Sequence, residues 1–194
     1  MKILSISITR NDNKPAINLA SVSNLSSFGF FERSSVQEFI NFFSITISER
    51  TPSGQRQTVE QDGMFGHVHS RPEGISIMII SDAEYPSRVA FTLISKIGEE
   101  FISQVPKTNW KANVGFAPLQ EYLVTYQDPH KADPIMKVQK ELDDTRIIMH
   151  KTIESVLERG EKLDNLVNRS EQLSSHSKLF YKSAKSTNSC CRIM

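Results

Sequence analysis

The stretch VLERGEKLDNL, residues 156–166, places one arginine inside an apolar helical repeat. Steps of three and four residues along a helix return to the same face, so Val156, Arg159 and Leu163 are predicted to share one seam. A guanidinium buried on such a seam is costly unless partner chains supply acceptors, and a polar seam residue also fixes the alignment of packed helices. Gly160 weakens an isolated helix by about 1 kcal/mol. Both residues favour a segment that folds on binding; an Arg159 that extends from the edge of the seam into water is the alternative.

The same alternation of three and four residues runs from position 135 to position 187. Most seam positions are apolar, and apart from Arg159 the others are Ser or Thr. A seam of this length is typical of a coiled coil, and a long amphipathic helix lying on its own domain is the alternative. Mixed charges between the seam positions argue against a helix that lies in a membrane surface. Besides Arg159, the seam comprises Ile135, Val138, Leu142, Thr145, Met149, Thr152, Val156, Leu163, Leu166, Ser170, Leu173, Ser177, Phe180, Ala184 and Thr187.

The chain before this repeat has the pattern of a mixed α+β domain. Period-two alternation and turn residues predict an N-terminal hairpin and then three strands between residues 55 and 82. Ser35 and Glu38 have the spacing of a capping box, which predicts the start of a helix between the second and third strands. Helical spacing after Pro86, and again from Phe116 to about Tyr126, predicts two more helices. Five strands and three helices in this order predict an α/β sandwich.

The sequence ends in SCCRIM, residues 189–194, which contains both cysteines of the chain. Cys191 begins a C-a-a-X prenylation signal, and a terminal Met usually selects farnesyl; Arg192 departs from the aliphatic preference of the motif. One short lipid anchors only reversibly, so Cys190 is expected to supply a second signal by S-palmitoylation. These covalent lipids are the only expected non-protein groups. Nearby basic residues would add weak attraction to anionic lipids: Lys178, Lys182 and Lys185.

Several classes of protein are disfavoured. The net charge of +1 does not indicate a nucleic-acid binder, and the N-terminus lacks a secretory signal. No stretch has the length of a membrane-spanning helix. No phosphate-binding loop or nucleophile elbow is present, so neither a small GTPase nor an enzyme of the hydrolase type is expected. His67 and His69 on one strand lack further ligands, and no metal site is expected.

The 156–166 stretch, together with the seam that runs from 135 to 187, resembles the SNARE motif of arginine-contributing (R-) SNAREs. The resemblance places Arg159 at the position of the ionic central layer and the other seam residues at the remaining layers. The preceding domain resembles a longin domain, a profilin-like α/β sandwich with a five-stranded antiparallel sheet and three helices. The tail resembles that of a lipid-anchored, synaptobrevin-like longin SNARE. The resemblance implies a longin domain at 1–127, a linker at 128–133, a SNARE coiled-coil helix at 134–189 and a lipidation tail at 190–194.

What the resemblance implies is a membrane-fusion protein. Its SNARE helix would join three glutamine-contributing (Q-) SNARE helices in a parallel bundle, and its other expected partners are the SNARE disassembly and prenylation machinery. It would lie in the cytoplasm and, through the lipid, on the cytoplasmic face of Golgi, endosome, vacuole or lysosome, and vesicle membranes. The family also allows a second prenyl group at Cys190. A prenylated coiled-coil adaptor or tether without fusion activity is the alternative.

A reversible anchor leaves an exposed lipid and an unpaired seam in water, and both are aggregation liabilities. We therefore expect the longin domain to fold back over them. Phe42 and Ile45 are candidates for the fold-back surface, because they are the apolar residues of the first helix that lie off its core-facing stripe. Ordinary packing beneath a neighbouring loop is the alternative explanation.

Overall fold

The computed structural model describes residues 2–61, 63–129, 147–150 and 152–190, with side chains through Lys185. In chain order the strands and α-helices are β1 (Ile3–Arg10), β2 (Ile17–Ser23), α1 (Arg33–Arg50), β3 (Arg56–Gln61), β4 (Met64–Ser70), β5 (Ile75–Asp82), α2 (Ser87–Gln104), α3 (Pro118–Thr125), β6 (Ile147–His150), α5 (Leu163–Arg169) and α6 (Ser175–Cys190). Two 3₁₀ turns, η1 (Lys107–Asn109) and η3 (Ile153–Ser155), complete the list.

The strands form one sheet in the order β2-β1-β5-β4-β3-β6. All neighbouring pairs are antiparallel except β3 and β6, which pair in parallel with Arg56 opposite Ile147. The central strand β5 is buried on both faces: Ile77 and Ile79 belong to one apolar cluster, and Met78 and Ile80 to the other. A nearly continuous apolar sequence suits such a strand because neither of its faces meets water.

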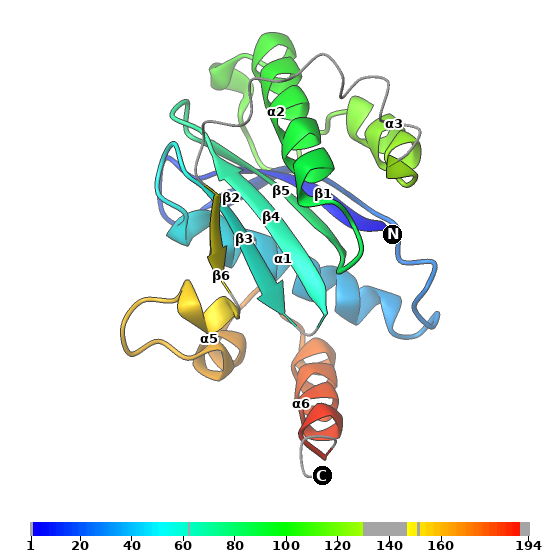
Figure 1. Cartoon of the computed structure of the whole chain (residues 1–194). Coiled ribbons are helices and arrows are strands. Elements are labelled where there is room, and N and C mark those ends of the chain that lie inside the picture. Colours follow the sequence, from blue (N-terminus) through cyan, green and yellow to red (C-terminus); the bar gives the residue numbers. More distant parts are fainter. Residues whose placement is uncertain (1, 62, 130–146, 151, 191–194) are drawn as a thin grey trace.

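Helices cover both faces of the sheet (Figure 1). Helices α2 and α3 lie on one face and bury Phe91, Phe101 and Leu119 there. Helix α1 lies on the other face with η3, α5 and α6, which together with β6 make up what we call the C-terminal segment, the described residues between 147 and 190. The expected five strands and three helices are all present, so the α/β sandwich is confirmed.

Two expectations about the sheet and the C-terminal segment were wrong. The sheet has a sixth strand, β6, which comes from the region expected to be helical and makes the sheet mixed rather than purely antiparallel. The described part of the C-terminal segment is also not one long helix, since it consists of β6, η3, α5 and α6. The physical reason is that apolar seam residues such as Leu163 and Leu173 can be buried against the N-terminal domain of the same chain.

The predicted start of the first helix was also displaced. Helix α1 begins at Arg33, after Glu32, so Ser35 and Glu38 lie inside the helix and do not form the predicted capping box. Both side chains bind the C-terminal segment, as described below. Among the described residues, no helix has both the length and the apolar character needed to cross a membrane.

Candidate functional site: the C-terminal segment docked on α1

The C-terminal segment buries apolar side chains against α1 and the sheet. Leu163, Val167 and Leu173 are buried, Val167 with only 1% of its surface exposed, and they share one apolar cluster with Phe42 and Phe43 of α1. Burial of each such side chain contributes about 1.5–3 kcal/mol before the entropic cost of ordering the segment. Docking therefore occupies apolar surface that the N-terminal domain would otherwise expose.

Helix α6 packs against the first half of α1 through polar and aromatic contacts. The Ser174 backbone N–H donates to Glu38 Oε2 at 2.8 Å, and Ser35 Oγ lies 2.8 Å from His176 Nδ1. The hydrogen bond from the Ser174 backbone lowers the pKa of Glu38. The ring of Phe39 stacks on that of Tyr181 with centroids 5.3 Å apart. Such pairs add about 0.5–1.5 kcal/mol to the burial of the rings.

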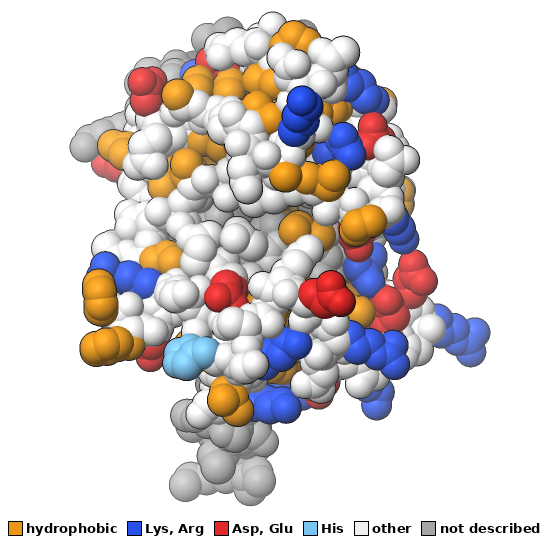
Figure 2. All heavy atoms as spheres, turned by 180° about the vertical axis from the view of Figure 1, so that it is seen from behind, with side chains coloured by type: hydrophobic (Ala, Val, Ile, Leu, Met, Phe, Trp, Pro, Cys, Tyr) orange, Lys and Arg blue, Asp and Glu red, His pale blue; other side chains and the backbone are white. Residues whose placement is uncertain are grey.

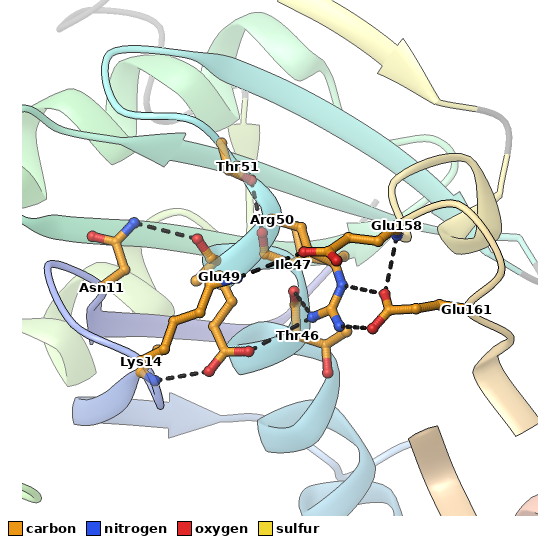
Figure 3. Close-up of polar contacts among 11 residues, drawn as sticks. Asn11, Lys14, Thr46, Ile47, Glu49, Arg50, Thr51, Glu158 and Glu161 are labelled. Carbon is orange, nitrogen blue, oxygen red and sulfur yellow. Dashed lines mark hydrogen bonds and ion pairs between the residues drawn. The ribbon is translucent and has the colours of Figure 1, made fainter. Parts of the chain in front are cut away.

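A two-pronged ion pair holds the loop before α5 (Figure 3). Arg50, the last residue of α1, donates from Nε to Glu161 Oε2 at 3.0 Å and from Nη2 to Glu161 Oε1 at 2.9 Å. Arg50 Nη1 also donates to the Thr46 carbonyl oxygen, which fixes the guanidinium on the helix end. The pKa of Glu161 is lowered, chiefly by this bond to Arg50. Nearby, Lys14 and Glu158 lie 3.7 Å apart as a largely exposed pair.

Asp164 joins α5 to α6 within the segment. Lys185 Nζ donates to its carboxylate oxygens at 2.7 and 2.5 Å, and the Tyr181 hydroxyl donates to Oδ1 at 2.8 Å. The hydrogen bond from Lys185 is the main cause of a lowered pKa at Asp164. The two helices therefore dock on α1 as one unit.

Figure 2 views this side of the molecule and shows Lys and Arg side chains gathered at the lower right, over the part that contains α5.

The structure separates the predicted seam residues into three groups. Leu163, Leu173 and Ser177 are buried on the N-terminal domain; Val156, Leu166, Ser170 and Phe180 are half-buried. Met149, Thr152, Arg159 and Ala184 are exposed. Ile135, Val138, Leu142, Thr145 and the side chain of Thr187 lie outside the described residues, as do Cys191 and the side chain of Cys190.

Arg159 and Gly160 stand at the turn between η3 and α5. The Arg159 side chain extends into water, so the docked segment does not bury its charge. Gly160 has φ +92°, a left-handed conformation that L side chains rarely adopt. The helix predicted to run through position 159 is therefore interrupted here, and the central stretch of the seam is not helical in this conformation.

The two candidates for a fold-back surface have different environments. Phe42 is 6% exposed and lies in the cluster that contains Leu163 and Leu173, whereas Ile45 is half-buried and belongs to neither apolar cluster. Sequence reasoning missed Phe39, which faces Tyr181. It also missed Val167 and Ile153, both buried at positions off the seam. The sequence did contain a signal for these two residues, because both are apolar although they lie outside the three-and-four repeat of the seam.

An apolar pocket opens between α1 and the sheet beside the docked segment. Its wall comprises Phe39, Ile40, Phe43, Gln61, Met64, Gly66 and Ile80. These residues come from α1 and strands β3, β4 and β5, and all but Gln61 and Gly66 have large apolar side chains. Its composition suits an apolar group, but its volume of about 70 Å³ is well below the roughly 300–1,000 Å³ of sites that enclose a whole small molecule.

Among the described residues, the histidine pair on β4 does not belong to any group of three or more potential metal ligands. His67 is fully buried, with its Nδ1 3.1 Å from Thr58 Oγ1, and burial lowers its pKa to about 4. Across the ranges that the structure describes, no group of three or more His, Cys, Asp or Glu residues has the arrangement of a metal site.

Comparisons with known proteins agree with this two-part arrangement. Residues 25–123 match the Longin family, described as a regulated-SNARE-like domain, and residues 134–192 match the Synaptobrevin family. The chain is 55% identical over 196 residues to the synaptobrevin homolog ykt6 of Schizosaccharomyces pombe, 53% identical over 200 residues to YKT6 of Debaryomyces hansenii, and 51% identical over 200 residues to YKT6 of Saccharomyces cerevisiae. Each match covers 100% of both chains.

Proposed function

Since the chain belongs to the synaptobrevin family, it is an R-SNARE of vesicle fusion and not an enzyme, and we propose that its longin domain holds the SNARE segment in an autoinhibited, closed form. The observation that carries the proposal is the burial of Leu163, Leu173 and Ser177 against the domain. These are seam residues, and one side chain cannot pack on α1 and inside a helical bundle at the same time. Docking and assembly therefore compete for the same surface.

In the assembled state, three Q-SNARE helices replace the longin domain as the covering surface. The 134–189 segment becomes one helix of a parallel four-helix bundle, and the central-layer glutamines supply the acceptors that a buried Arg159 requires. In the closed form Arg159 remains in water, so its desolvation does not oppose closure. Folding of the bundle from the N-terminal end of the segment toward the tail brings the two membranes together. The SNARE disassembly machinery then returns the chain to its free state.

Membrane attachment in this proposal depends on the tail. The prenylation machinery modifies Cys191 with farnesyl, and Cys190 carries palmitate or a second prenyl group. A single chain of this length binds membranes reversibly, so the protein divides between the cytoplasm and the cytoplasmic face of Golgi, endosomal, vacuolar or lysosomal, and vesicle membranes. The pocket lined by Phe39, Phe43 and Met64 is a candidate contact for one end of the free lipid in the closed form.

The experiment that tests closure uses side chains that are buried on the domain but lie off the seam. Ile153→Ala and Val167→Ala should loosen the docked segment without removing a seam residue. Mixed with Q-SNARE helices, both variants should form the same heat-resistant complex as the unchanged chain, but faster. Leu179→Ala is the matched control, because Leu179 is off the seam and exposed. If all four proteins assemble at one rate, closure does not control assembly.

The same assay separates fusion from the alternative of a prenylated adaptor or tether, which the family membership does not favour. A SNARE assembles with Q-SNARE helices into a heat-resistant complex, and Arg159→Ala should lower the stability of that complex without changing the closed form. An adaptor would form no such complex with any set of Q-SNARE helices.

A further inference from the structure

Three cationic or ionisable side chains lie together on the α2 side of the sheet, across from the docked segment. Arg56 of β3 and His69 of β4 are directly opposite each other across the two strands, and Arg71 follows β4. Arg56 is 8% exposed, and its Nη2 donates to Ser95 Oγ of α2 at 3.4 Å. The backbone of Arg56 pairs with Ile147 of β6, whereas its side chain reaches Ser95 of α2 on the face opposite α1.

Two nitrogen atoms in this cluster are buried and have no hydrogen-bond partner among the residues that the structure describes. They are Nε of Arg56 and Nδ1 of His69. No ion pair joins Arg56 to a carboxylate among the described residues. Burial, and after it the charge of Arg71, lowers the pKa of the Arg56 guanidinium. A buried charged donor without a partner costs more than a neutral one, so each such group in a folded protein calls for an explanation, of which an absent ion is one.

The third member, Arg71, lies against helix α2 at Gly98, where the missing side chain leaves space for it. A Cβ atom at Gly98 of α2 would lie 3.0 Å from Arg71 Cδ and 3.2 Å from its Nη1. A glycine in a helix interior costs about 1 kcal/mol relative to alanine, and at this position it lets the guanidinium lie against the helix. Arg71 also binds Glu73, with Nη2 donating to Oε1 at 2.8 Å. Glu73 is therefore the carboxylate that an incoming anion would displace.

We propose that Arg56, His69 and Arg71 form a binding site for a phosphate group, carried either by a soluble phosphate compound or by a phosphorylated lipid headgroup. Guanidinium groups bind phosphate oxygens through paired N–H donors, and the imidazole supplies a further donor once it is protonated. With no anion bound, burial together with Arg56 and Arg71 lowers the pKa of His69 to about 4, while Glu73 acts in the opposite direction. A bound phosphate dianion adds the negative charge that the cluster lacks.

The test follows the His69 ring by nuclear magnetic resonance in the full chain while inorganic phosphate is added. We expect saturable shifts of the His69 signals and a rise in the pKa of His69. Arg56→Gln and Arg71→Gln should each weaken binding about tenfold or more, since a hydrogen bond to a charged group contributes about 1.5–3 kcal/mol. Glu73→Gln should tighten binding, because it removes the competing carboxylate; a purely structural Glu73 predicts no such gain.

Lys111→Gln is the control, because it changes the net charge equally at an exposed position. Vesicles of phosphatidylcholine with or without a phosphoinositide identify the source of the phosphate: binding to phosphoinositide vesicles alone assigns a lipid headgroup, and binding of inorganic phosphate alone assigns a soluble compound. If Arg56→Gln does not fold, Arg71→Gln and Glu73→Gln decide the question. The proposal is overturned if neither inorganic phosphate nor phosphoinositide vesicles change the His69 signals, or if Lys111→Gln weakens binding as much as Arg71→Gln.

Discussion

Replacement of Glu161 by Gln should open the closed form. The carboxylate accepts two hydrogen bonds from Arg50, at 3.0 and 2.9 Å, and the two side chains are 12% and 28% exposed. Glutamine keeps one acceptor and loses the charge. Hydrogen bonds to charged groups contribute about 1.5–3 kcal/mol when buried, and partial exposure reduces that figure, so we expect a loss of about 1–2 kcal/mol. The equilibrium between closed and open forms would shift about 5- to 30-fold toward the open form.

Glu158→Gln is the matched control, three residues away on the same segment. Its partner Lys14 lies 3.7 Å away and both side chains are 68% exposed, so an effect below about twofold is expected. Neither glutamate is a seam residue, which leaves the bundle layers unchanged in both variants.

The assay measures the rate of assembly with Q-SNARE helices when opening limits that rate, together with the efficiency of energy transfer between dyes on α1 and α6. Arg50→Gln combined with Glu161→Gln completes a double-mutant cycle. The reasoning is refuted if Glu161→Gln behaves as Glu158→Gln does, or if the effects of Arg50→Gln and Glu161→Gln are fully additive.

Three other predictions concern the same equilibrium. Gly160→Ala should favour assembly, because alanine is strained at φ +92° in the closed form and is about 1 kcal/mol better than glycine in a helix; assembly no faster than for the unchanged chain would contradict this. Phe42→Glu should raise the membrane-bound fraction in cells far more than Ile45→Glu, since only Phe42 is buried in the docking cluster; equal membrane fractions would show that the docking cluster does not hold the segment. Acidification should open the chain: docking lowers the pKa of Glu161 and Glu38 from 4.5, so their contribution is complete well above pH 4.5 and is lost as the pH falls through the lowered values. Energy transfer that stays constant from pH 7 to about pH 3 would exclude such a contribution.

The layered domain could be predicted because its signals are local. Alternation along β1, the apolar run of β5 and the helical spacing of α2 each report which faces are buried, and burial follows directly from them. The conformation of the SNARE segment could not be predicted in this way. Its repeat shows that Leu163 and Leu173 must be covered but does not show by what, because the longin domain and a helical bundle both bury the same side chains.

The polar contacts of the site show the same limit. Ser35 and Glu38 have the spacing of a capping box, and that local pattern was predicted to operate within α1. In the structure, Glu38 instead accepts a hydrogen bond from Ser174, and Ser35 is hydrogen-bonded to His176. These partners lie at least 136 residues away in the sequence. A motif that satisfies backbone donors in one place can satisfy them in another, and only the tertiary contacts decide which. Phe42 was identified because it was apolar and had no assigned role, and the same reasoning applied to Val167 would have identified it too.

Strand β6 makes the last strand-to-strand contact on its side of the sheet, where it pairs with β3. For residues 147–150 to become helical, this pairing must break, and β3 is left with a row of unpaired N–H and C=O groups. Bare strand edges of this kind recruit other strands, including those of identical chains. An open chain without a bundle partner is therefore at risk of joining another open chain edge to edge. In the proposed mechanism, opening beside partner SNARE helices shortens the time for which this edge is bare, so the closed form would protect solubility as well as control the time of assembly.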